Sequence, residues 1–147
     1  MEGKKYMQEK DNINEKYDNN SIRSLSDKKA VRLRPATYFG SDDARGSFYS
    51  FIEILDNAID EYKAGYGSKI IITKYEDNSL EIQDFGRGLP VDFNTIENKY
   101  NWELVCCKLN AGGKYSSKNY KFSKGLNGLG LSVSQFASEY MDIEVFR

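Results

Sequence analysis

The sequence contains no histidine, and this absence excludes more chemistry than any other feature of the composition. Nucleophilic catalysis of the Ser/His/Asp or Cys/His kind needs an imidazole, and so does every histidine-based metal site. General-base work in this chain must therefore fall to aspartate, glutamate or lysine.

Cysteine is also scarce, and its placement excludes the usual cysteine sites. The two cysteines, Cys106 and Cys107, are adjacent, which suits neither an ordinary disulfide framework nor a metal site with spaced ligands. We predict that both are reduced thiols in the core, on a helix.

Neither sign of charge dominates the chain, and long apolar runs are missing. With 21 basic and 22 acidic side chains, the protein has no bulk positive field to attract DNA or an anionic membrane. No apolar run approaches the roughly 18 residues of a membrane span, and the lysine-bearing start lacks the apolar stretch of a signal peptide. The sequence therefore predicts a cytoplasmic protein with no membrane partner.

The residues that are present suffice for one folded domain. The chain has 147 residues, of which 39% are apolar and 14% aromatic, so it can form a real core. Residues 1–22 are mostly lysine, glutamate, asparagine and aspartate, and we predict a largely flexible N-terminal arm with Tyr17 and Ile22 as its anchors. Residues 23–147 are predicted to be the folded domain.

Hydrophobic periodicity predicts the helices. They are expected over residues 27–34, 45–64, 101–109 and 131–138. Pro35 should end the first helix, because the residue before a proline avoids the helical conformation. Gly65 should end the second helix as a left-handed cap.

Three strands and the loops between elements are predicted from alternation and from turn residues. Strands are expected over 69–75, 80–84 and 142–146, with the isoleucines of the first strand buried. The first two strands are separated by a short polar segment that is typical of a hairpin. Loops or turns are expected at 36–47, 84–90 and 110–130. The last of these is polar and long, which is typical of a lid or binding loop.

The stretch "EILDNAIDE", residues 53–61, lies on the longest predicted helix and carries two faces. Glu53, Asn57 and Asp60 are spaced i, i+4 and i+7, which places them on one side. The apolar residues gather on the other side: Phe48, Phe51, Ile52, Leu55, Ala58, Ile59 and Tyr62. The acid and amide side is either an ordinary solvated face or one wall of a binding site.

The stretch "GLNGLG", residues 125–130, stands immediately before a predicted helix. Glycines there let the backbone approach a ligand, and the helix start offers free N–H groups to an anion such as phosphate. Lys114, Lys121 and Lys124 lie in the same segment and would meet phosphate oxygens as point charges. A flexible hinge with solubilising lysines is the alternative interpretation.

The stretch "DFGRG", residues 84–88, follows a predicted strand. One interpretation is that Asp84 accepts hydrogen bonds from an exocyclic amine of a base, while Gly86 and Gly88 let the chain pass close to a flat ring. The alternative is a surface turn closed by the aspartate side chain.

These motifs, in this order, resemble the Bergerat-type ATP site of the GHKL superfamily. The finer resemblance is to the bacterial type II DNA topoisomerase branch, in the N-terminal ATPase domain of the gyrase B and topoisomerase IV E subunits. Five stretches match blocks of that branch in order: "AVRLRPATYFG", "EILDNAIDE", "QDFGRGLPV", "LNAGGKY" and "YKFSKGLNGLGLSVSQFAS". The match covers about residues 17–147.

The resemblance implies a role for each matching position. Glu53 would be the general base that orients and deprotonates the attacking water. Asn57 would hold Mg²⁺ through its amide oxygen, and Asp84 would bind the adenine amine. The other implied nucleotide-binding residues line the adenine pocket, close over the phosphates or belong to the arm: Arg87, Gly88, Pro90, Lys114, Lys121, Gly125, Leu126, Asn127, Gly128, Leu129, Gly130 and Tyr17.

The resemblance also implies a fold, a function and partners. The fold would be a two-layer α/β (α+β) sandwich, with helices on one face of a mixed, mostly antiparallel sheet and ATP between helix and lid. The function would be the ATP-binding and hydrolysing gate of a type II topoisomerase, in which ATP-driven homodimerisation through the arm is coupled to DNA strand passage. The partner would be a cleavage subunit of the gyrase A or topoisomerase IV C type.

Because the family's full-length protein carries further domains, residues 23–147 are expected to be an incomplete ATPase domain, monomeric and inactive alone. Two alternatives remain open. A GHKL histidine kinase-type catalytic domain is disfavoured, since such domains usually lack the glutamate found at Glu53. The other alternative is a nucleotide-binding fragment that does not hydrolyse ATP.

Overall fold

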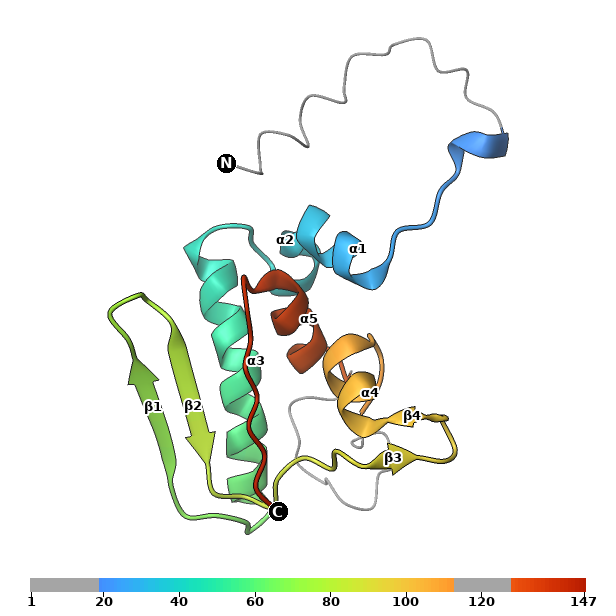
Figure 1. Cartoon of the computed structure of the whole chain (residues 1–147). Helices are drawn as coiled ribbons and strands as arrows, with labels where there is room; N and C mark the ends of the chain where they lie inside the picture. The colour runs from blue at the N-terminus through green and yellow to red at the C-terminus, as the bar shows by residue number, and fades with distance from the viewer. Residues whose placement is uncertain (1–18, 113–127) are drawn as a thin grey trace.

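The structure is a computed structural model that describes residues 19–112 and 128–147 (Figure 1). In chain order the elements are the 3-10 helix η3 (Asn19–Ser21), α1 (Asp27–Leu33), α2 (Pro35–Phe39), α3 (Ala44–Lys63), β1 (Ile70–Lys74), β2 (Leu80–Asp84), β3 (Phe93–Asn94), β4 (Lys99–Tyr100), α4 (Asn101–Cys107) and α5 (Gly130–Ala137). All four predicted helices and the predicted hairpin are confirmed. Tyr17 and residues 113–127 of the predicted loop lie outside the described residues.

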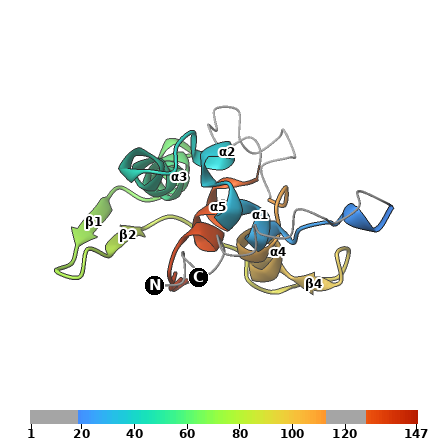
Figure 2. The same ribbon diagram turned by 90° about the horizontal axis from the view of Figure 1, so that it is seen from above.

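The long helix α3 lies between the hairpin and the other helices, as Figures 1 and 2 show from two directions. One side of α3 contacts β2, and α2 and α5 also pack against it. Both described strand pairs, β1 with β2 and β3 with β4, are antiparallel. The α/β class is confirmed. Within the described ranges, no helix is both long enough and apolar enough to span a bilayer.

The core is centred on α5, which contacts α1, α3 and α4. Val133 and Phe136 are spaced i, i+3 on α5, so they share one face, and they form a buried cluster with Val31 of α1 and Phe39 of α2. Burying each such side chain contributes about 1.5–3 kcal/mol. The apolar side of α5 therefore holds α1 and α2 in place.

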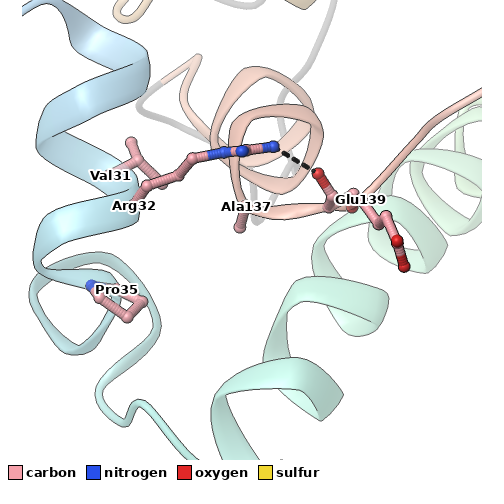
Figure 3. Close-up of a pocket in the computed structure, with 6 residues that line it drawn as sticks. Val31, Arg32, Pro35, Ala137 and Glu139 are labelled. Atoms are coloured by element: carbon pink, nitrogen blue, oxygen red, sulfur yellow. Dashed lines mark hydrogen bonds between the residues drawn. The ribbon is translucent and has the colours of Figure 1, made fainter. Parts of the chain in front are cut away.

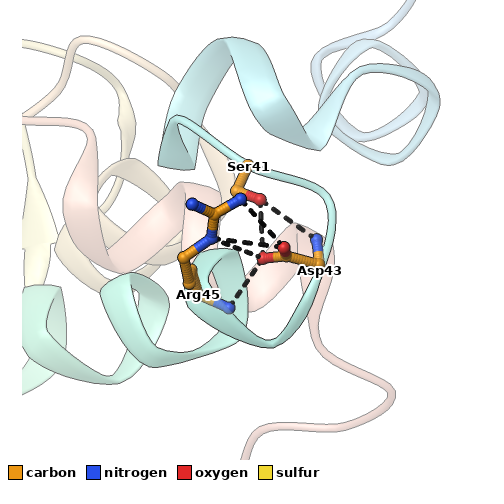
Figure 4. Close-up of polar contacts among 3 residues, drawn as sticks. All are labelled: Ser41, Asp43 and Arg45. Atoms are coloured by element: carbon orange, nitrogen blue, oxygen red, sulfur yellow. Dashed lines mark hydrogen bonds and ion pairs between the residues drawn. The ribbon is translucent and has the colours of Figure 1, made fainter.

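The start of α3 is fixed by a polar cap. The Asp43 side chain accepts a hydrogen bond from the backbone N–H of Arg45 at 2.8 Å, and its carboxylate also meets the Ser41 hydroxyl and the Arg45 guanidinium (Figure 4). These hydrogen bonds, that from Ser41 above all, lower the pKa of Asp43 to about 2. The carboxylate keeps its charge, and the helix its cap, down to acidic pH.

The end of α3 confirms the predicted left-handed cap. Gly65 has φ 87°. Its N–H donates to the Tyr62 carbonyl, and the N–H of Tyr66 donates to the Glu61 carbonyl, both at 3.0 Å. These two bonds form a Schellman motif, so the chain direction after α3 is fixed.

The predicted two-faced pattern of α3 is only partly correct. Ala58 is buried, but Phe48 and Tyr62 are 58% and 57% exposed, and Asp60, expected on the polar side, is 4% exposed. The physical reason is that α3 is contacted by the hairpin and by two helices, so burial is not confined to one arc. Phe48 and Tyr62 lie near the two ends of the helix.

Three predictions about strands and loops are wrong. Segment 36–47 is not all loop, because α2 begins at Pro35, which suits a first helical position, and ends at a left-handed Gly40. Ile72 is 50% exposed, since β1 belongs to a two-stranded ribbon covered by α3 on the β2 side. Residues 142–146 form no strand, because no described strand pairs with them.

Arg32 ties α1 to the end of α5. Its Nε donates to the Phe136 carbonyl at 2.7 Å and its Nη2 to the Ser138 carbonyl at 3.0 Å; Figure 3 shows the side chain reaching from α1 toward the end of α5. Cationic side chains commonly satisfy the last carbonyls of a helix in this way. Arg32 and Ser138 also border a cavity of about 340 Å³.

We expect Arg32→Lys to lower the free energy of unfolding by about 1 kcal/mol, because lysine keeps the charge but cannot place two donors on two carbonyls. Urea unfolding followed by circular dichroism measures the change. Arg34→Lys is the matched control, since no hydrogen bond joins the Arg34 side chain to the described residues, and it should change stability by less than about 0.5 kcal/mol. Equal effects of the two substitutions would contradict this role of Arg32.

The two cysteines of α4 differ in environment, so the prediction that both are core thiols is correct only for Cys106. Cys106 is buried and Cys107 is exposed. Burial raises the pKa of Cys106 to about 11, and the thiolate is the reactive form. We expect iodoacetamide at pH 8 to alkylate Cys107 and spare Cys106, as read by peptide mass spectrometry. Both should react in urea, and equal labelling of the native chain would contradict the packing of α4.

Candidate functional site

The predicted base and metal ligand lie one turn apart on α3. Asn57 is half-buried and its Nδ2 donates to the backbone carbonyl of Glu53 at 3.0 Å, while the Glu53 side chain is exposed. Because the amide nitrogen is used by the helix backbone, Oδ1 is the amide atom directed away from that carbonyl. An amide oxygen beside a carboxylate is a pair that suits a hard cation and a water.

The start of α5 lies against Glu53. A Cβ added to Gly130 would collide with Oε2 of Glu53 and would lie 3.2 Å from its Cβ, so the start of α5 lies directly against the Glu53 side chain. The first N–H groups of a helix have no partner within it and form the positive end of its dipole. Glu53 and the anion-attracting end of α5 therefore meet at one place.

Gly128 and Leu129 lead into α5. Gly128 has φ 57°, a left-handed conformation that favours glycine. Leu129 packs partly buried against the core cluster. A Cβ added to Gly112 would lie 3.6 Å from Cα of Gly128. The last residue of the first described range and the first residue of the second therefore lie next to each other. The predicted residues Lys114, Lys121, Gly125, Leu126 and Asn127 lie outside the described residues.

Asp84 stands at the end of β2, where its Oδ1 accepts a hydrogen bond from the Gly86 N–H at 2.8 Å. This is the turn bond expected in the alternative interpretation of the motif. The Asp84 residue is exposed, so this turn also presents a carboxylate to solvent. A Cβ added to Gly86 would lie 2.9 Å from Oδ1 of Asp84 and 3.0 Å from Cβ of Glu61, so the turn packs directly on α3.

Arg87 is held from two directions. Its Nε and Nη2 donate to the two carboxylate oxygens of Glu61 at 3.0 and 2.8 Å, a bidentate pair of the strong kind. Its guanidinium carbon lies 3.9 Å from the centre of the Tyr66 ring. No local sequence pattern predicted the contribution of Tyr66.

The next two predicted residues follow the same turn. Gly88 has φ 75°, and an added Cβ would lie 2.8 Å from the Phe146 carbonyl oxygen. Glycine is therefore required there for both conformation and space. Pro90 is exposed.

The predicted residues thus form two groups along α3. Glu53, which lies against Gly130, and Asn57 form one group, and Asp84 and Arg87 lie at the end of α3 beside Glu61. The eight steps from Glu53 to Glu61 span about 12 Å of helix axis. Among the described residues there is no group of three acidic or cysteine side chains that could hold a metal ion. A cation at Asn57 would need ligands from a bound molecule or water.

Two cavities lie away from these groups. That of about 340 Å³ is lined by α1 and the end of α5, and one of about 280 Å³ is lined by α2, the start of α3 and the end of α5. Neither cavity includes Glu53, Asn57 or Asp84.

Comparisons with known proteins show the family to which the chain is related. A family model described as "Histidine kinase-, DNA gyrase B-, and HSP90-like ATPase" matches residues 42–147. The DNA gyrase B subunit of Thermotoga maritima is 44% identical over 133 residues, which are 90% of this chain and 21% of the relative. The DNA topoisomerase 4 B subunit of Bacillus subtilis is 41% identical over 131 residues, 89% of this chain and 20% of the relative. The chain spans about a fifth of the length of these relatives.

A solved structure shows the same fold. The 43K ATPase domain of Thermus thermophilus gyrase B, in complex with an aminocoumarin, matches with a TM-score of 0.59 at 37% identity, over 78% of this chain and 27% of that one. The expected GHKL fold is thereby confirmed. With a family model over residues 42–147 and this agreement in fold, the chain belongs to the family of histidine kinase-, DNA gyrase B- and HSP90-like ATPases.

Proposed function

We propose that this chain binds and hydrolyses ATP as part of the gate of a type II DNA topoisomerase. The observation that carries the proposal is the contact between Glu53 on α3 and Gly130 at the start of α5. A phosphate bound at the start of α5 would meet its N–H groups. The carboxylate of Glu53 would then be beside the γ-phosphate.

In this arrangement Glu53 acts as the general base. It orients a water and accepts its proton while the water oxygen bonds to the γ-phosphorus, and the bond from phosphorus to the β,γ-bridging oxygen breaks to release ADP. Phosphoryl transfer needs mainly positioning and neutralisation of charge. Lys114 and Lys121 are proposed to supply positive charge at the phosphates, together with the backbone of Gly125, Leu126 and Asn127.

Asn57 is proposed to hold Mg²⁺ through Oδ1. Mg²⁺ usually keeps several waters and is bound by few protein ligands together with substrate phosphates. The donor set suits this ion, because Asn57 offers a hard oxygen and the described residues contain no larger cluster of acidic ligands. The ion would neutralise the charge that develops on the phosphates.

The adenine end of the nucleotide is proposed to lie at Asp84. Its carboxylate would accept a hydrogen bond from the exocyclic amine, and Gly86 next to it brings no side chain of its own to the ring. Arg87, Gly88 and Pro90 would border the mouth of this pocket. The separation of about 12 Å between the two groups on α3 suits an extended nucleotide.

The role that we propose for the full-length protein depends on this ATP site. For the full-length enzyme we propose ATP-driven homodimerisation through the arm that contains Tyr17, coupled to DNA strand passage. We also propose a cleavage subunit of the gyrase A or topoisomerase IV C type as its partner. The relatives named above are topoisomerase and gyrase subunits, which favours this function over a histidine kinase-type catalytic domain.

We expect Glu53→Gln to lower ATP turnover by roughly 10² to 10⁴ while nucleotide binding is kept, because glutamine preserves size and hydrogen bonding but accepts no proton. The assay is steady-state ATPase rate in a chain extended to the length of the relatives. Asp56→Asn is the matched control on the same helix and should keep near wild-type turnover. Near wild-type turnover in Glu53→Gln would end the general-base assignment.

Asn57→Ala should behave differently, because it removes a metal ligand that helps to hold the nucleotide itself. Affinity for a non-hydrolysable Mg·ATP analogue should fall along with turnover. The affinity for the analogue measured with Mg²⁺ should also exceed that measured with a chelator by less than in the wild type. Calorimetry with and without Mg²⁺ measures both effects. An unchanged dependence on Mg²⁺ would rule out Asn57 as the ligand.

Asp84→Ala should weaken binding of an ATP analogue by about 1–3 kcal/mol, the cost of leaving the adenine amine without its acceptor. The wild-type chain should also prefer the ATP analogue to a GTP analogue, since guanine presents a carbonyl where adenine has the amine. Asp77→Ala is the matched control, because Asp77 closes the β1–β2 turn with a similar bond to the Ser79 N–H at 2.9 Å. Equal affinity for the two nucleotides would contradict the assignment.

A further inference from the structure

Arg87 is held by three bonds to one carboxylate and by one aromatic face. Besides the two guanidinium bonds, its backbone N–H lies 3.4 Å from Oε2 of Glu61. The carboxylate fixes one edge of the guanidinium plane, and the ring of Tyr66, at 3.9 Å, lies against its face. An edge and a face together define the orientation of a planar group.

Backbone contacts at Tyr66 and at the following residue fix the position of Tyr66. Its N–H donates to the carbonyl of Glu61, the residue that binds Arg87. The following Gly67 has φ 75°, and an added Cβ would lie 2.8 Å from the carbonyl carbon and oxygen of Phe85. The end of α3, Tyr66 and the turn that carries Arg87 are therefore one packed unit.

We propose that Tyr66 is a positioning residue for the nucleotide site: it sets the plane of the Arg87 guanidinium at the adenine end and so contributes to ATP affinity. This inference rests on the proposed function. The side chain of Arg87 is 38% exposed, so without the ring its outer part would sample more rotamers. Fixing the group before the nucleotide arrives reduces the entropy lost on binding.

The size of the effect follows from the exposure of the pair. A cation–π contact at an exposed site changes an equilibrium by about two- to fivefold. The effect should depend on the aromatic face and not on the hydroxyl. Phenylalanine should therefore replace Tyr66 with little loss, whereas leucine should not.

The experiment measures the dissociation constant of a non-hydrolysable Mg·ATP analogue by calorimetry in the full chain. The variants are Tyr66→Phe, Tyr66→Leu, Arg87→Ala and the double variant Tyr66→Leu/Arg87→Ala. We expect Tyr66→Leu to weaken binding two- to fivefold and Tyr66→Phe to remain within about twofold. In the Arg87→Ala background, Tyr66→Leu should have no further effect, because the ring acts through the guanidinium.

A second measurement reads the contact itself without nucleotide. The proton on Nε of Arg87 should show an upfield ring-current shift by NMR in the wild type and in Tyr66→Phe, and the shift should be lost in Tyr66→Leu. Tyr75→Leu is the matched control for removing a half-exposed tyrosine, since Tyr75 lies at the β1–β2 turn and bonds Glu81. It should leave both the resonance and the affinity unchanged.

The outcomes distinguish a failure of the positioning role of Tyr66 from a failure of the proposed function. Loss of affinity in Tyr66→Leu that persists equally without Arg87 would overturn the positioning role, and so would unchanged affinity in Tyr66→Leu or the absence of a ring-current shift in the wild type. A wild-type chain that binds no ATP analogue would overturn the proposed function and, with it, the role of Tyr66 in that site.

Discussion

The close approach of α5 to α3 is the constraint on which the candidate site depends. Gly130 lies against the Glu53 side chain, and the approach is fixed further along by the Ser134 hydroxyl, which donates to the Ser50 carbonyl at 3.1 Å. Ser134 is almost fully buried, so this bond is shielded from water and costly to lose. Arg32 secures the other end of α5 from α1. A helix held at both ends presents its first N–H groups at a fixed place beside Glu53.

The second constraint is the packed corner at the end of α3. The Schellman motif turns the chain back toward the hairpin, and the turn after β2 then lies directly on Glu61. The two groups of site residues are therefore attached to one rigid helix, which sets their separation. This is the arrangement that favours a precise site, because elements of secondary structure hold side chains better than loops do.

Local sequence patterns were sufficient to predict several elements of the fold. The helix from Ala44 to Lys63, its glycine cap and the β1–β2 hairpin have strong periodic or turn signals. The roles of Glu53, Asn57 and Asp84 come from their matching motifs and stay predictions. The burial of Asp60, the exposure of Ile72 and the missing strand at 142–146 were not predictable in the same way. Burial depends on which elements cover each face, and a strand depends on a partner. Tyr66 was missed because its contact joins the end of a helix to a turn 21 residues later, and no local spacing indicates such a pair.

The central claim is that one nucleotide contacts both groups along α3 at once. Titration of a non-hydrolysable Mg·ATP analogue into the ¹⁵N-labelled chain, followed by NMR, tests this most directly. The amide resonances of Gly86 at the adenine end and of Gly130 and Leu131 at the start of α5 should move with one common dissociation constant, while those of Phe93 and Tyr100 in the β3–β4 pair stay in place. Movement of only one group, or saturation of the two groups at different concentrations, would contradict the account.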